Sequence, residues 1–187
     1  MIKYLIHGGN YDEPLEINDS YLSQLTIHPN NRGNKVLLIY FAHPKTKWTE
    51  LFEKDKKRIT KLSSIPNLEF KVAEESTITY DIEQANYINI RGGDSFRLLD
   101  FMSKVGDIKP LFQNKVVAGV SAGAYMLSKY FYSNDYQKLG SGLGLLNIKT
   151  YCHYNTTDID IITRLAKYKE DLPLLILPSY TFVTILD

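Results

Sequence analysis

The sequence feature that most constrains this chain is an apolar run that ends at a serine between small residues. Val116–Ala118 leads into Gly119-Val-Ser-Ala-Gly123, and apolar residues then recur at helical spacing as far as Phe131. This order predicts a buried strand, a sharp turn and a helix. A serine on such a turn has a strained backbone and needs small neighbours. The pattern is typical of a nucleophile elbow, so Ser121 is the candidate nucleophile.

The predicted helix begins at Ala122, directly after this serine. The first N–H groups of a helix lack partners inside the helix, and the helix dipole is positive at this end. Both could stabilise an oxyanion beside the Ser121 hydroxyl. The five-residue pattern by itself is a common accident, and it gains weight from the strand before it and the helix after it.

Strands and helices alternate along the rest of the chain. Apolar runs predict strands over residues 2–9, 35–42, 68–72 and 85–90, with helices over 46–62 and 96–102. After the central helix, we expect a strand or turn over 148–153, a helix over 157–169 and a last apolar run over 172–177. This alternation predicts an α/β fold: a doubly wound, mostly parallel sheet flanked by helices, in one domain spanning residues 1–187.

Composition narrows the class of protein and of partner. The chain has 187 residues, 44% hydrophobic and 23% charged, with a net charge of +1. Nothing in this balance favours nucleic acid or an anionic membrane. A single cysteine excludes an internal disulfide, and no apolar run reaches the length of a membrane span. We therefore expect a cytoplasmic protein, as a monomer or a homodimer. The four histidines lack the spacing of metal ligands and a second cysteine, so the sequence does not support a structural zinc site.

The candidate site should lie where the parallel strands end, because ligands of open α/β sheets bind beyond the carboxyl ends of their strands. His7-Gly-Gly9 and Arg91-Gly-Gly-Asp94 follow predicted strands, as Ser121 does. We expect His7, Gly9, Arg91 and Asp94 to contact a substrate there. Arg91–Asp94 lacks the spacing of a nucleotide-binding loop.

An activated serine needs a base, and the base needs an orienting partner. His7, His43 and His153 each lie at the end of a predicted strand, and Asp135 lies between Ser121 and His153 in the sequence. Cys152 is an unsuitable nucleophile for His153, since adjacent residues of a strand point to opposite faces.

Three motifs in order resemble the peptidase E family, which includes aspartyl dipeptidases and, more distantly, cyanophycinases. They are Gly92-Gly-Asp-Ser-Phe96 with Leu98-Leu99, then Ala118-Gly-Val-Ser-Ala-Gly-Ala124, then Cys152-His-Tyr154. The resemblance runs from the first strand to about Pro178. It implies the fold of class I glutamine amidotransferases, a flavodoxin-like α/β arrangement, with serine in place of cysteine at the elbow.

The resemblance also implies roles for individual residues. Ser121 would be the nucleophile, His153 the general base and Asp135 the third member of a triad. The oxyanion would be bound by the N–H groups of Ala122 and Gly93, or of Gly92. The implied activity is that of a serine peptidase, acting on a small peptide or related amide without a metal or other cofactor.

The chain departs from the family pattern beside the site. Relatives have Gly-Gly-Gly-Asn where this chain has Arg91-Gly-Gly-Asp94, which predicts a charge pair beside the oxyanion donors. The arginine by which aspartyl dipeptidases recognise a substrate carboxylate has no clear counterpart; Thr157-Asp158 stands at the matching place, and Arg164 follows in a predicted helix. The alternative interpretation is a ligand-binding or regulatory protein of the same fold with a degenerate triad.

Overall fold

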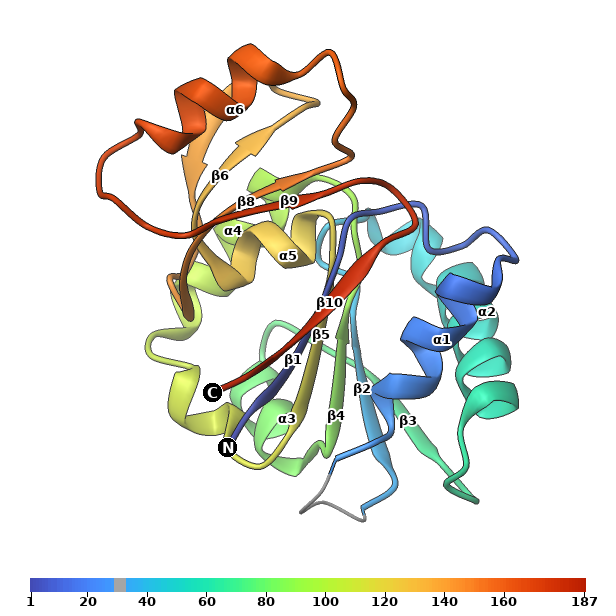
Figure 1. The fold of residues 1–187 in the computed structure, drawn as a ribbon. Coiled ribbons are helices and arrows are strands. Elements are labelled where there is room, and N and C mark those ends of the chain that lie inside the picture. Colours follow the sequence, from blue (N-terminus) through green and yellow to red (C-terminus); the bar gives the residue numbers. More distant parts are fainter. Residues whose placement is uncertain (29–32) are drawn as a thin grey trace.

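The main element of the computed structural model, which describes residues 1–28 and 33–187, is a six-stranded sheet in the strand order β10-β1-β5-β4-β2-β3 (Figure 1). Its strands are β1 (Lys3–His7), β2 (Lys35–Ile39), β3 (Glu69–Val72), β4 (Tyr87–Ile90), β5 (Val116–Val120) and β10 (Phe182–Leu186). Neighbouring strands are parallel except β10, which pairs antiparallel with β1. Every residue of β1, β4 and β5 is buried, as expected for strands covered on both faces.

Helices cover both faces of this sheet, so the predicted doubly wound α/β fold is confirmed. The helices α1 (Glu16–Leu25) and α2 (Trp48–Leu62) pack on one face. The opposite face is covered by α3 (Ile78–Gln84), α4 (Ser95–Met102) and α5 (Ala122–Leu127). Figure 1 shows α1 and α2 together on one side of the strands.

A second sheet, in the order β7-β6-β8-β9, lies above the helix face that carries α4 and α5 (Figure 1). Its strands are β6 (Ser128–Ser133), β7 (Lys138–Ser141), β8 (Leu146–Cys152) and β9 (Leu174–Leu177). One face shares an apolar core with α5, and the other is covered by α6 (Ile159–Ala166). The expectation of a single sheet was therefore incomplete.

The prediction that the helix after Ser121 continues to Phe131 is wrong. The helix ends at Leu127, and Ser128 begins β6. The Ser128 hydroxyl donates to the Ala124 carbonyl at 2.8 Å and lies 2.5 Å from Thr150 Oγ1 of β8. The segment that follows is rich in aromatic residues, which favour strands, and it pairs with β7 and β8.

The two sheets bring four chain segments to one place. These are the residues that follow β1, β4, β5 and β8, namely Gly8-Gly9, Arg91–Gly93, Ser121 and His153. In the part of the chain that the structure describes, no helix is long and apolar enough to cross a membrane.

Candidate active site

Ser121 lies at the turn from β5 into α5 in a backbone conformation that side chains rarely adopt. Its φ is 47° and its ψ is −100°, and its N–H donates to the carbonyl of His7 at 2.9 Å. Such a conformation costs energy and persists only when the surroundings enforce it. A Cβ on Gly119 would lie 2.7 Å from the backbone of Gly123, so the turn requires glycine there.

The Ser121 hydroxyl is hydrogen-bonded to His153. Its Oγ lies 3.0 Å from Nε2 of the imidazole, and the ring is largely buried. The backbone N–H of His153 donates to the Gly8 carbonyl at 3.0 Å, which links the end of β8 to the end of β1. His43 lines the same cavity, but the hydrogen bond to Ser121 comes from His153. The structure thus brings together the two residues that the sequence predicts as nucleophile and base.

The other ring nitrogen of His153 meets Ser179, which sequence reasoning missed. Nδ1 lies 3.0 Å from Ser179 Oγ, in the turn between β9 and β10. For Nε2 to accept the Ser121 proton, Nδ1 must carry the ring hydrogen, which it then donates to the Ser179 oxygen. Ser179 therefore occupies the orienting position predicted for Asp135.

Asp135 lies in the turn between β6 and β7, exposed, and lines the same cavity as Ser121 and His153. Burial lowers the pKa of His153 below its ordinary value of 6.5, and the negative charge of Asp135 acts in the opposite direction. Asp135 thus acts on the base through its field, whereas the hydrogen bond to Nδ1 goes to Ser179.

Of the three residues predicted to supply oxyanion donors, Ala122 follows Ser121 in the chain, and Gly92 and Gly93 line the same cavity as Ser121. The N–H groups of Gly92, Gly93 and Ala122 donate to no acceptor among the hydrogen bonds of the described residues. Gly92 is near enough that a Cβ there would lie 3.3 Å from Ser121 Cβ. Gly93 has a φ of 134°, and a Cβ on it would lie 2.9 Å from the Ala42 carbonyl oxygen. The loop therefore needs glycine where it passes the nucleophile.

The predicted charge pair between Arg91 and Asp94 is wrong. Asp94 caps α4, where its carboxylate accepts from the N–H groups of Phe96 and Arg97, and it also accepts from the Tyr136 hydroxyl at 2.7 Å. These donors hold the pKa of Asp94 below its ordinary value despite partial burial. Asp94 does not line the cavity, whereas Arg91 does.

His7 does not reach the cavity either. It is fully buried; its Nε2 lies 3.0 Å from Asn18 Oδ1, and its Nδ1 accepts from the N–H of Gly9 at 3.0 Å. Burial lowers the pKa of His7 to about 4, so the ring is neutral at pH 7. His7 fixes Gly9, which has a φ of 120° and lies against the His153 ring so closely that a Cβ would overlap it.

The thiol of Cys152 is sequestered. Its side chain is fully buried, and burial raises its pKa far above the ordinary value. This agrees with the expectation that Cys152 and His153 point to opposite faces. Among residues 1–28 and 33–187, no group of three or more His, Cys, Asp or Glu side chains is placed to hold a metal ion.

A cavity of about 420 Å³ opens above the nucleophile. Its lining residues include Ser121, His153, Gly92, Gly93, Arg91, His43, Asp135 and residues 9–13. Ser121, His153, Gly92 and Gly93 thus line one space.

Comparisons with known proteins agree with this arrangement. A peptidase from an acI-B1 Actinobacterium has a similar structure, with a TM-score of 0.71 and 21% identity, over 99% of this chain and 84% of that one. A candidate peptidase E protein from Listeria monocytogenes EGD-e matches with a TM-score of 0.62 and 20% identity, over 99% and 98%. No curated protein matches the chain.

At these identities the two structures support the fold, and the family is shown by the sequence itself. The model of peptidase family S51 matches residues 5–187, nearly the whole chain, which confirms the resemblance to peptidase E. The strained serine, its imidazole partner and this match together make the chain a member of peptidase family S51, a family of serine peptidases.

Proposed function

We propose that this peptidase cleaves a small peptide or related amide through an acyl-enzyme at Ser121. His153 removes the Ser121 proton as Oγ attacks the carbonyl carbon, and the N–H groups of Ala122 and Gly93, or Gly92, bind the resulting oxyanion. His153 then protonates the leaving amine, which departs and leaves an ester on Ser121. Water, deprotonated by His153, attacks the ester, and His153 returns that proton to Ser121 Oγ as the bond to the acyl group breaks and the acid is released.

The observation that carries this proposal is the hydrogen-bonded series Ser121–His153–Ser179, at 3.0 Å in each step, with the serine on a strained turn. Ser179 orients the ring, and Asp135 favours its charged form from a distance. The distance of 3.0 Å between Ser121 Oγ and His153 Nε2 lies within the range of 2.6–3.2 Å expected of a nucleophile and its base. This distance supports proton transfer between the hydroxyl and the imidazole.

The test is labelling with a serine-directed fluorophosphonate, read by intact mass. We expect one addition to the wild type and none to Ser121→Ala, because only an activated hydroxyl displaces the fluoride. The matched control is Ser103→Ala, at an exposed position remote from the cavity, which should label like the wild type. Labelling of Ser121→Ala, or its failure in a folded wild type, would contradict the proposal.

One observation favours the second candidate, a ligand-binding protein that retains the fold. The partner of His153 Nδ1 is a neutral hydroxyl, which offers no charge to stabilise the imidazolium. A folded wild type that fluorophosphonate does not label, but that binds a dipeptide by calorimetry, would establish this alternative.

A further inference from the structure

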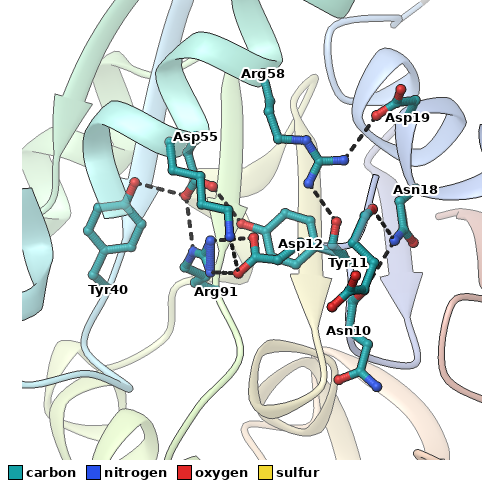
Figure 2. A network of polar contacts seen from close by, with 11 residues as sticks. Asn10, Tyr11, Asp12, Asn18, Asp19, Tyr40, Asp55, Arg58 and Arg91 are labelled. Carbon is teal, nitrogen blue, oxygen red and sulfur yellow. Dashed lines mark hydrogen bonds and ion pairs between the residues drawn. The ribbon is translucent and has the colours of Figure 1, made fainter. Parts of the chain in front are cut away.

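Arg91 is buried beside the cavity and is fully engaged by other residues. Only 4% of it is exposed, and it donates to both carboxylate oxygens of Asp12, at 2.6 and 3.0 Å. Its Nε donates to Asp55 at 3.3 Å, and its guanidinium lies 4.9 Å from the centre of the Tyr11 ring. Figure 2 shows Arg91 between the two carboxylates.

Asp55 anchors this network to α2. It is 2% exposed and also accepts from the hydroxyls of Tyr11, at 2.7 Å, and Tyr40, at 2.9 Å. Burial raises the pKa of the Asp55 carboxyl, while Arg91 and the two tyrosines act in the opposite direction. With donors on both oxygens, Asp55 holds Arg91 in one place, and a buried charge left without its partner would be costly.

The backbone of Arg91 leads directly into Gly92 and Gly93, the two residues of the proposed oxyanion loop. Its N–H donates to the Ile39 carbonyl, and the N–H of Asp94 donates to the Ala42 carbonyl, each at 3.1 Å. The free N–H groups of Gly92 and Gly93 lie between these two bonds. Glycines have little conformational restraint of their own, so the position of the loop depends on its flanking residues.

The same network holds the cavity wall formed by residues 10–13. Lys54 of α2 pairs with Asp12 at 3.1 Å, and Arg58 donates to the Tyr11 carbonyl at 2.6 Å. This wall begins at Gly9, which packs against His153. Through Asp12, Arg91 therefore joins the oxyanion loop to the wall that supports the base.

We propose that Arg91, held by Asp12 and Asp55, is a positioning residue that sets the Gly92 and Gly93 donors relative to Ser121, and that it does not bind substrate carboxylates. The inference rests on the proposed chemistry of Ser121. A lysine would keep the charge but could not serve two carboxylates with the planar fork of a guanidinium. Displacement of a catalytic group by about 1 Å can cost roughly 10²-fold in rate.

The experiment measures the saturation kinetics of fluorophosphonate labelling, because the phosphoryl oxygen needs the same donors as an oxyanion. Arg91→Lys and Asp12→Asn should each lower the maximal labelling rate about 10- to 100-fold, with the half-saturating concentration within about twofold of the wild type. The double variant should lose less than the product of the two single losses, because both substitutions disrupt the contact between residues 91 and 12.

Asp19→Asn is the matched control, because Asp19 pairs with Arg58 and lies apart from Arg91 (Figure 2). It should label at the wild-type rate. If Arg91→Lys does not fold by circular dichroism, Asp12→Asn carries the test, since Asp12 is 35% exposed and its loss leaves the bond between Arg91 and Asp55.

Two results would overturn the positioning role while leaving Ser121 as nucleophile. One is a wild-type maximal rate in both folded variants. The other is strong protection of the wild type by Asp-Ala that Arg91→Lys abolishes, which would show that Arg91 binds a substrate carboxylate. An unlabelled wild type would refute the Ser121 proposal and this inference together.

Discussion

Nδ1 of His153 is hydrogen-bonded to a hydroxyl group, where other triads have a carboxylate. In those triads the carboxylate both orients the imidazole and stabilises its positive charge. Ser179 fixes the tautomer and the direction of the ring, but it carries no charge to stabilise an imidazolium. We expect the charge to come instead from Asp135, which is exposed to solvent and favours the charged form of His153. Its effect on the base should therefore depend on salt, as exposed charges do.

The pH dependence of labelling tests these separate roles of Ser179 and Asp135. Burial lowers the pKa of His153 below 6.5, and only the neutral imidazole can accept a proton. We therefore expect the labelling rate to be maximal above this pKa and to fall as the pH drops through it. Asp135→Asn removes a charge that favours the imidazolium, so the midpoint should move to lower pH. Ser179→Asp should move it to higher pH.

High salt provides the control, because it screens the exposed charge of Asp135. It should shift the wild-type midpoint to lower pH, as Asp135→Asn does, and leave the midpoint of the Asp135→Asn variant unchanged. A midpoint that Asp135→Asn leaves in place would show that the carboxylate does not act on the base.

At the scale of single elements, the strand ends place the site, and they were predictable in part. The runs that form β1, β2, β4 and β5 are too apolar to lie at a surface, and the small residues around Ser121 fit only a tight turn. Strand position alone left His7, His43 and His153 as alternatives, and the motif Cys152-His-Tyr154, through its resemblance to peptidase E, singled out His153. These positions follow from local sequence.

Ser179 could not be found in this way. Pro178-Ser179-Tyr180 is an ordinary turn sequence, and its contact with His153 arises only because the chain crosses there from the second sheet to the first. The strand β6 was misassigned for a related reason, since Tyr130 and Phe131 fit helical spacing and only their pairing with β7 and β8 decides the outcome.

Gly9, at the end of β1, provides a test at this scale. Gly9→Ala should abolish labelling, because the methyl group would displace the His153 ring, and should lower the free energy of unfolding by about 1–2 kcal/mol for the positive φ alone. Gly106→Ala is the matched control: its φ is 83°, and a Cβ there would meet nothing within 4 Å. It should lose similar stability but label normally. Normal labelling of folded Gly9→Ala would contradict this account of His153.

At the scale of the whole molecule, the near-neutral chain carries an acidic cavity. Among the described lining residues, Asp12, Glu13 and Asp135 are acidic, and the lone cation, Arg91, is occupied by Asp12 and Asp55. Burial lowers the pKa of both His43 and His153, so neither adds charge at neutral pH. Arg164, which follows the place of the family's carboxylate-binding arginine in the sequence, lies on α6 over the Tyr132 ring and is not among the residues that line the cavity.

This charge distribution predicts weak cleavage of Asp-X dipeptides. A substrate carboxylate would meet like charges without a free cation, whereas a neutral or basic amino-terminal residue would not. In a dipeptide panel, we expect kcat/KM for Asp-Ala to be at least about tenfold below that for Ala-Ala or Lys-Ala. The Arg91→Lys variant should show the same ranking. A preference for Asp-Ala above about 100-fold would contradict this prediction and would mean that a cationic side chain moves into the cavity when the substrate binds.

The contact between Ser179 and His153 also sets a time at which this peptidase can begin to work. Synthesis completes the elbow at α5 first; the base follows at the end of β8, and the residue that orients it comes later still, in the turn before β10. β10 then pairs with β1, which is synthesised before the elbow. At roughly 5 to 20 residues per second, the nascent chain carries Ser121 without an oriented base for several seconds. We therefore expect hydrolytic activity only after the turn that carries Ser179 has been synthesised and has reached His153.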